Sequence, residues 1–322
     1  MSAFLPISAD LFFSKQDKLD PRLGELVQIF SAQGPIQKDH IYLLGYPDDE
    51  GIRLNGGRPG AQDGPDRIRQ FLYRLTPPYR SEAPRLWEAG NLSLQSDIES
   101  RHETAQSMAQ QILSSHGRIL SFGGGHDYGY PDGAAFLESC RTTANNRKPL
   151  VINFDAHLDV RSSEKGLSSG TPFYRLMEKY GDSFDLIELG IQSQCNSSYH
   201  IDWCRERGAR LLFWEDIMFS GEPAAVVVGR FLEEELLRPR PVFLSIDIDG
   251  FSSSIAMGCS QSWATGWSAE EFFPVFHMFL SRWDVRSLGI YEVSPPLDQD
   301  NRTAKLAAQI AHRFIFHNKV GE

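Results

Sequence analysis

Cysteine is scarce in this sequence. The 322 residues include four cysteines, Cys140, Cys195, Cys204 and Cys259, and these form neither a Cys-x-x-Cys pair nor a zinc-type spacing. The pattern excludes a small disulfide scaffold and gives no sign of a cysteine-based metal site. We expect these thiols to be buried or chemically idle.

Long hydrophobic runs and an excess of basic residues are also missing. No stretch reaches the ~18 consecutive apolar residues that a membrane helix needs. Lys and Arg number 32 against 42 Asp and Glu, a net charge of −10, and no basic stripe is present. Because nucleic acid and anionic membranes are bound largely through Lys and Arg, we expect neither as a partner, and a small-molecule substrate instead. Residues 1–18 show no secretory signal pattern, so the expected location is cytoplasmic.

Short apolar segments alternate with segments of helical character along the whole chain. Most of the apolar segments are continuously hydrophobic, which is typical of parallel strands buried on both faces. The alternation predicts an α/β fold with a single, mostly parallel, doubly wound sheet and helices on both faces. The expected strands are Ile41–Tyr46, Arg118–Phe122, Leu150–Phe154, Leu186–Gly190, Ala209–Trp214, Val242–Ile248 and Ser287–Val293. The expected helices are Gly64–Leu75, Glu99–Ser114, Pro131–Cys140, Ser198–Arg207, Pro223–Leu237, Ala269–Arg282 and Thr303–Phe316.

No long linker divides the chain. We therefore expect residues 39–322 to form one domain, with residues 1–38 as an N-terminal extension packed on it. Three segments rich in Gly, Ser or Pro are expected to be long loops: residues 52–66, 161–172 and 250–266. Ligands of open α/β sheets bind beyond the carboxyl ends of the strands, so these loops should contribute to the functional site.

Two of the expected strands end in acidic residues. Asp155, His157 and Asp159 follow one strand at alternate positions, so in an extended chain they would point to one side and converge. Asp247 and Asp249 end another strand with the same spacing. Burying such groups together is unfavourable unless a cation neutralises them, which points to a metal ion.

A third strand leads through Gly123–Gly125 to His126. The glycine run lacks the Gly-Lys-Ser/Thr ending of a P-loop, so a phosphate-binding loop is disfavoured, and glycine instead lets the backbone pass close to a metal site. Four Asp and two His are too many donors for one zinc ion but suit a pair of hard divalent ions. We therefore predict two Mn²⁺ per chain, with the metal ligands His126, Asp155, His157, Asp159, Asp247 and Asp249.

The metal motifs resemble those of a known family. GGGHD at 123–127, DAHLD at 155–159 and SIDID at 245–249 are similar, in order and spacing, to the metal motifs of the arginase/agmatinase (ureohydrolase) family. The resemblance covers roughly residues 40–318, and the segments at 49–69, 168–173, 188–192 and 292–308 are most similar to its formimidoylglutamase branch. It implies an arginase-like fold, a manganese-dependent hydrolase of amidines and a homo-oligomer.

The resemblance also implies roles for individual residues. Asp155 and Asp247 would bridge the two ions and act in catalysis, and Glu292 would bind the cationic amidine end of the substrate. The most similar branch implies hydrolysis of N-formimidoyl-L-glutamate to L-glutamate and formamide, a reaction of histidine degradation. Residues 168–171 lack the His that arginases and agmatinases carry there, which counts against a guanidino substrate, and the loop after Asp249 lacks the family's usual prolines.

Several arginines are candidates for binding the substrate's acid group. Arg161 continues the alternate spacing of Asp155, His157 and Asp159, so in an extended chain its side chain would lean toward the metals. Its planar guanidinium is suited to binding a substrate carboxylate there. Arg53, Asn55 and Arg58 lie in a neighbouring loop and could supply further contacts. For each of these residues a purely structural role, such as charge balance, stays open.

Three alternative functions remain at this point. The first is a ureohydrolase that acts on another guanidino acid or an agmatine-like substrate and releases urea. The second is a binding or regulatory protein that retains the metal site. The third is a metal-dependent deacetylase with a single zinc ion, which a count of bound metal would distinguish.

Overall fold

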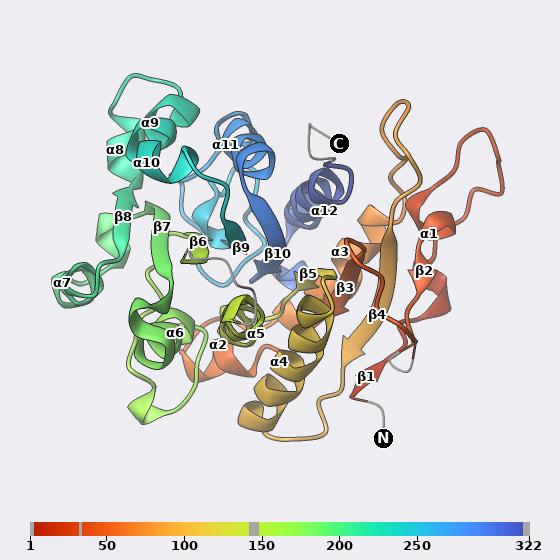
Figure 1. Cartoon of the computed structure of the whole chain (residues 1–322), viewed down its shortest axis with the longest axis horizontal. Coiled ribbons are helices and arrows are strands. Elements are labelled where there is room, and N and C mark those ends of the chain that lie inside the picture. The colour runs from red at the N-terminus through yellow and green to blue at the C-terminus, as the bar shows by residue number, and fades with distance from the viewer. Residues whose placement is uncertain (1–2, 32–33, 142–147, 318–322) are drawn as a thin grey trace.

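The computed structural model describes residues 3–31, 34–141 and 148–317. Within these residues ten strands form one sheet in the order β1-β4-β3-β5-β10-β9-β6-β7-β8, with β2 also paired to β4 (Figure 1). Every neighbouring pair is parallel except β1 and β4, which are antiparallel. The strands are β1 (Phe4–Leu5), β2 (Gln28–Ile29), β3 (Ile41–Gly45), β4 (Leu86–Leu92), β5 (Arg118–Phe122), β6 (Leu150–Phe154), β7 (Asp185–Ile191), β8 (Arg210–Phe213), β9 (Pro241–Asp247) and β10 (Asp284–Tyr291).

Helices cover both faces of the sheet, because the central strands are hydrophobic on both sides. Every residue of β3, β6 and β9 is buried. Figure 1 shows α4, α5 and α6 along one side of the sheet and α9, α11 and α12 along the other, and a separate hydrophobic core fills each side. The helices are α1 (Leu23–Leu26), α2 (Glu50–Leu54), α3 (Gly64–Leu72), α4 (Ile98–Ser114), α5 (Gly129–Arg141), α6 (Pro172–Tyr180), α7 (Ser198–Glu206), α8 (Trp214–Met218), α9 (Ala224–Phe231), α10 (Glu233–Leu236), α11 (Ala269–Arg282) and α12 (Arg302–Ile315).

The predicted fold class is confirmed, and all seven predicted strands are present with small changes of their bounds. Strand β4 was not predicted because its residues alternate between buried and half-buried, whereas the prediction relied on continuous apolar runs. The predicted loop at 52–66 is wrong in part, since it contains most of α2 and the start of α3. The predicted helix at 223–237 is interrupted at Leu232, which separates α9 from α10.

The N-terminal residues join the main sheet. Strands β1 and β2 both pair with β4. Strand β3 lies between β4 and β5, the strand that leads to His126. The boundary between residues 38 and 39 stays a prediction.

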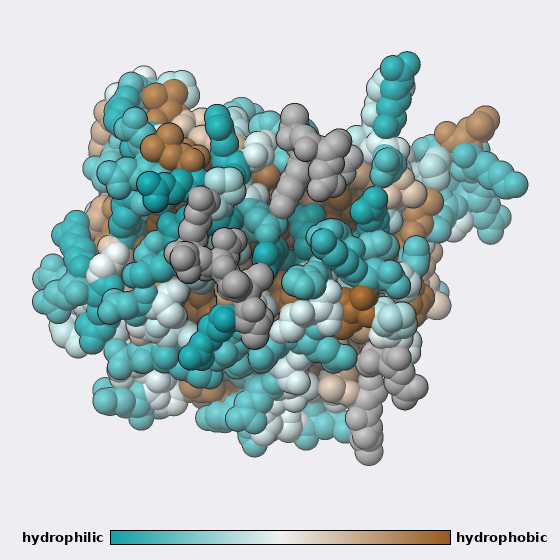
Figure 2. All heavy atoms as spheres, viewed as in Figure 1, coloured by the Kyte–Doolittle hydropathy of each residue, from teal (hydrophilic) through white to brown (hydrophobic). Residues whose placement is uncertain are grey.

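The surface shown in Figure 2 is largely hydrophilic, with hydrophobic side chains in small separate groups. Exposed large hydrophobic residues include Phe219 and Leu237, which follow α8 and α10. The helices of the described ranges are each too short or too polar to cross a bilayer.

Candidate metal centre

His126 reaches the centre of the sheet through the glycine run that follows β5. A Cβ atom on Gly123 would lie 2.2 Å from the ring of Tyr291, and one on Gly124 would lie 1.8 Å from the carbonyl oxygen of Asp48. Only glycine therefore allows the chain to pass here, and close backbone packing rather than phosphate binding explains the run. The His126 ring then stacks on Tyr291, with 5.0 Å between the ring centroids.

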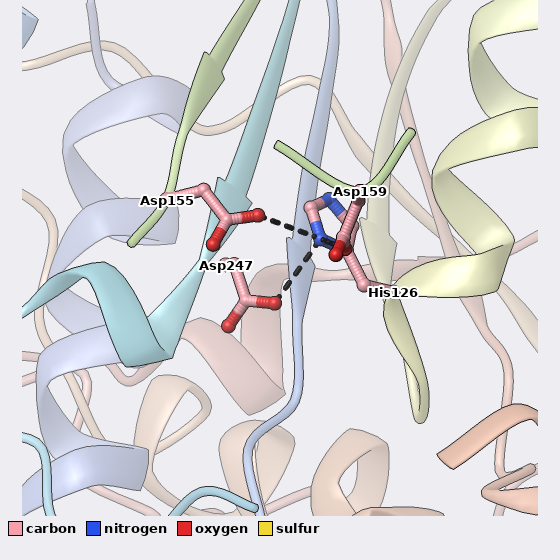
Figure 3. Close-up of side chains that lie close together, drawn as sticks. All are labelled: His126, Asp155, Asp159 and Asp247. Atoms are coloured by element: carbon pink, nitrogen blue, oxygen red, sulfur yellow. Dashed lines mark ion pairs between the residues drawn. The ribbon is translucent and has the colours of Figure 1, made fainter. Parts of the chain in front are cut away.

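Three carboxylates surround one nitrogen of His126 (Figure 3). Its Nε2 atom lies 2.8 Å from the hydroxyl of Ser245, which leaves the other ring nitrogen, Nδ1, for a second partner. Nδ1 lies 3.1 Å from Asp155 Oδ2, 2.9 Å from Asp159 Oδ2 and 3.1 Å from Asp247 Oδ2. His126 and Asp155 are completely buried, so this first group of candidate ligands is shielded from solvent.

A second group adjoins the first through Asp155. His157 Nδ1 lies 3.1 Å from Asp249 Oδ2 and 3.4 Å from Asp155 Oδ1. Asp155 thus faces the first group with Oδ2 and the second with Oδ1, the arrangement expected of a bridging carboxylate. The Oδ2 atom of Asp247 belongs to the first group. Its Oδ1 atom accepts the backbone N–H of Asp249 at 2.8 Å, just as Asp155 Oδ1 accepts that of His157 at 2.7 Å, and a bridging role for Asp247 stays a prediction.

The two groups fit a pair of divalent cations. The donor atoms of each group lie within 4.8 Å of one another. Adjacent ligands of an octahedral ion bound at about 2.1 Å lie about 3 Å apart, close to the separations around His126 and His157. Burial and, after it, the nearby charge of Asp155 raise the pKa of Asp247 from its ordinary value to about 6. Burial alone would lower the pKa of His126, but hydrogen bonds to the three carboxylates raise it well above its ordinary value, as expected where negative charge is in excess.

The backbone that presents these ligands is turned, and the prediction of an extended chain was wrong. Strand β6 ends at Phe154, and Asp159 has the left-handed φ of 47°. Asp159 therefore reaches the first group while His157 reaches the second, so the three residues of the motif do not converge on one point. Asp249 likewise lies in a short 3₁₀ helix, Ile248–Gly250, beyond the end of β9.

Glu292 follows β10 and faces the same site. Its backbone is also left-handed, with φ of 65°, and such strain in non-glycine residues is concentrated at functional sites. Its Oε1 atom accepts the backbone N–H of His126 at 3.1 Å, which ties the carboxylate to the metal-binding segment. Burial raises the pKa of Glu292 well above its usual range, and the charge of Asp247 adds to this effect.

A pocket of about 350 Å³ opens from the candidate metal ligands to solvent. Arg161 and Asn55 line it, whereas Arg53 and Arg58 do not. Arg53 instead pairs with Asp49 at 2.6 Å. The lining of the pocket also includes the site residues His157, Asp159, Asp247, Asp249 and Glu292.

Arg58 holds one wall of this pocket in place. Its guanidinium donates to the carbonyl oxygens of Ser260 at 2.9 Å and Cys259 at 3.0 Å, and its backbone N–H donates to the Ser260 hydroxyl at 2.9 Å. Because Ser260 lines the pocket, Arg58 supports the wall without lining it.

Several polar lining residues were not predicted. They lie in the segments that follow β6, β7 and β9, with His200 at the start of α7, and their position beyond the carboxyl ends of strands is the signal that could have identified them. They are Ser169, Gln194, Asn196, His200, Ser260, Gln261 and Trp263.

Fold and site together define an α/β protein with paired acidic metal groups at the carboxyl edge of a parallel sheet. The chain belongs to the arginase family, whose sequence profile matches residues 39–317, and by that membership it is a hydrolase of amidines. It is 31% identical over 275 residues to a formimidoylglutamase of Staphylococcus carnosus (strain TM300), and the match covers 85% of each chain.

Solved structures of relatives have the same architecture. The crystal structure of Trypanosoma cruzi formiminoglutamase with Mn²⁺₂ matches with a TM-score of 0.78 and 30% identity, covering 92% of this chain and 98% of that one. The formimidoylglutamase of Bacillus subtilis, at 23% identity, shares the fold with a TM-score of 0.81 and coverage of 94% and 93%.

Proposed function

We propose that this protein is a dinuclear manganese amidinohydrolase that converts N-formimidoyl-L-glutamate to L-glutamate and formamide, as in histidine degradation. The observation that carries the proposal is the pocket itself. It presents the buried carboxylate of Glu292 and the exposed guanidinium of Arg161 beside the paired metal groups. A substrate with a cationic amidine at one end and carboxylates at the other complements these charges.

The site holds residues suited to each part of this reaction. His126, Asp155, Asp159 and Asp247 would hold one ion, and Asp155, His157 and Asp249 the other. When bound, such a pair supplies hydroxide at neutral pH for attack on the amidine carbon. Cleavage of the bond from that carbon to the glutamate nitrogen then releases both products.

Glu292 would hold the amidinium by charge-assisted hydrogen bonds. Its orientation is fixed in advance, because one carboxylate oxygen is already bound to the backbone of His126. The carboxylate is therefore held in one orientation beside the pocket before substrate binds, which favours correct placement of the reacting carbon.

Arg161 would bind a substrate carboxylate. It makes no ion pair with any carboxylate in the described part of the chain, which leaves its guanidinium available to a substrate carboxylate. Its backbone N–H donates to the carbonyl oxygen of Gly170 at 2.8 Å, and a Cβ on Gly170 would come within 2.9 Å of Arg161 Cδ. Glycine at 170 therefore makes room for the arginine stem. Asn55, which donates to the Ser169 hydroxyl at 3.1 Å, is the second proposed substrate contact.

The proposal is tested by turnover and metal content together. Purified protein loaded with Mn²⁺ is incubated with formimidoylglutamate, arginine, agmatine and guanidino acids while formamide, ammonia and urea are measured. We expect two Mn²⁺ per chain and formamide from formimidoylglutamate. Urea from a guanidino compound would indicate a ureohydrolase, a single zinc with full activity would indicate a deacetylase-like enzyme, and bound metal without turnover would indicate a binding protein.

Location and assembly belong to the same proposal. We propose a cytoplasmic location, a small molecule as the partner and, from the family resemblance, a homo-oligomer. Gel filtration with light scattering would give the number of chains per particle.

A further inference from the structure

A row of polar residues crosses the sheet directly beneath the candidate metal ligands. Strand pairing aligns Ser121 on β5, Gly289 on β10, Ser245 on β9, Asn153 on β6 and Glu188 on β7. The four polar side chains of the row are completely buried. Buried polar groups in otherwise apolar strands weaken a fold unless they serve another purpose.

Two members of the row contact metal ligands. Ser245 lies within hydrogen-bond distance of His126, at 2.8 Å. Asn153 donates from Nδ2 to Asp155 Oδ2 at 3.2 Å and to Glu188 Oε2 at 2.9 Å. Both N–H groups of the Asn153 amide are therefore directed at carboxylates.

Glu188 has no evident role in stability. The hydrogen bond from Asn153 is its one interaction of that kind, its other oxygen, Oε1, has no partner among the described residues, and no basic side chain there pairs with it. Burial raises its pKa well above the usual range, opposed by the Asn153 hydrogen bond and increased by the charge of Asp155. A methionine or leucine would fill this position in the core at lower free energy.

We infer that Glu188 is a positioning residue that holds Asn153 with its N–H toward the bridging ligand Asp155. Rotation of an asparagine amide by 180° exchanges its oxygen and nitrogen, and the oxygen would repel the Asp155 carboxylate. Glu188 accepts the second N–H of the Asn153 amide. It therefore stabilises only the amide orientation in which Asn153 donates its other N–H to Asp155. The Oδ2 atom of Asp155 then stays directed at His126, as in Figure 3, and Oδ1 stays available to the second group. The inference rests on the metal centre proposed above.

The test measures Mn²⁺ binding to metal-stripped protein by calorimetry, and therefore needs no substrate. Glu188→Met keeps the side-chain length but removes the acceptor, and we expect Mn²⁺ affinity to fall ~10- to 100-fold, the usual effect of losing a residue that orients a ligand. Glu188→Gln still offers an oxygen to Asn153, so its affinity should stay within about three-fold of the wild type. The midpoint of thermal unfolding should be unchanged or higher in Glu188→Met, because a poorly paired buried carboxylate is lost.

Two further variants separate positioning from general loosening of the core. Asn153→Leu should weaken Mn²⁺ binding like Glu188→Met, and combining the two should add less than about a two-fold further change, because Glu188 acts through Asn153. Ile187→Ala, a buried neighbour on the opposite face of β7, should lower the unfolding temperature without weakening Mn²⁺ binding.

The inference is overturned if Glu188→Met binds Mn²⁺ like the wild type, if Glu188→Gln is as impaired as Glu188→Met, or if the effects of Glu188→Met and Asn153→Leu are additive. It is also overturned if Ile187→Ala weakens Mn²⁺ binding as strongly as Glu188→Met does.

A kinetic measurement adds to this test. With saturating Mn²⁺, we expect the kcat of Glu188→Met for formimidoylglutamate to fall while its KM changes less than about two-fold. Wild-type protein that binds two Mn²⁺ without hydrolysing formimidoylglutamate would remove the proposed substrate and leave this inference standing.

Discussion

Asp132 on α5 is a buried carboxylate that should make the protein less stable as the pH rises. It accepts hydrogen bonds from Tyr46 at 2.6 Å, from Tyr291 at 2.6 Å and from Ser121, with no basic residue paired to it in the described ranges. Burial raises its pKa from 3.8 to about 6, although the three hydroxyl donors oppose this change. The hydrogen bond from Tyr291 connects Asp132 to the ring that stacks on His126 and precedes Glu292.

The sign and size follow from proton linkage. Between pH 3.8 and 6 the folded state binds this proton more tightly than the unfolded state, so the free energy of unfolding falls as the pH rises and levels off above about 6. The difference between 3.8 and about 6, at about 1.4 kcal/mol per pKa unit, gives about 3 kcal/mol. Asp132→Asn removes the titration and retains hydrogen bonding, because the hydroxyl groups around it can rotate.

The assay is urea unfolding of metal-free wild type and Asp132→Asn at pH 4, 5, 6 and 7, followed by fluorescence. We expect the stability of the variant relative to the wild type to increase by about 2.4 kcal/mol over this range, slightly less than the full difference because the carboxyl of the unfolded chain is already more than half ionised at pH 4. The other titrating groups cancel in the difference. Chelator in every sample removes any contribution from bound metal. A difference that is flat with pH, or that shrinks as the pH rises, would refute the argument.

Three further predictions concern the site. Asp247→Asn should lower activity by several orders of magnitude, measured as formamide release, because it weakens the charge that holds a metal beside the reacting water; an active variant would contradict its role. Glu292→Gln should keep both metals by elemental analysis, since the amide oxygen still accepts the His126 N–H, yet lose most activity; loss of metal would make Glu292 a ligand or scaffold residue. Arg161→Ala should raise KM for formimidoylglutamate by roughly 10- to 100-fold, equivalent to about 1.5–3 kcal/mol, and Gly170→Ala, which crowds the arginine stem, should raise KM less; an unchanged KM in Arg161→Ala would move the carboxylate site elsewhere.

Local residue patterns were sufficient to predict the class of fold and the candidate ligands. Continuous apolar runs identify the central strands, because a strand covered by helices on both faces has no polar side. Acidic residues that follow such strands stand out, since burying them without a cation is unfavourable. Both signals are local, so they can be read without knowing which strands are neighbours.

The sequence did not reveal how the ligands divide between the two groups. Parity predicted one point of convergence, but the left-handed turn at Asp159 sends His157 and Asp159 to different groups. Such a turn is disfavoured by local preference and is held in place by the surrounding structure, so local rules point away from it. The same reason applies to Glu292, whose left-handed backbone brings its carboxylate beside His126.

By itself, then, the sequence determined the α/β class, the order of the strands along the chain and the chemical types of the site residues, because these depend on composition and spacing. Tertiary structure alone decided that β5, β10, β9, β6 and β7 lie side by side, which aligns Ser245, Asn153 and Glu188 beneath the ligands. It also placed Arg161 in the pocket and assigned Arg58 to the wall. These arrangements join residues tens to hundreds of positions apart, and their contacts depend on packing between strands and loops that no single segment encodes.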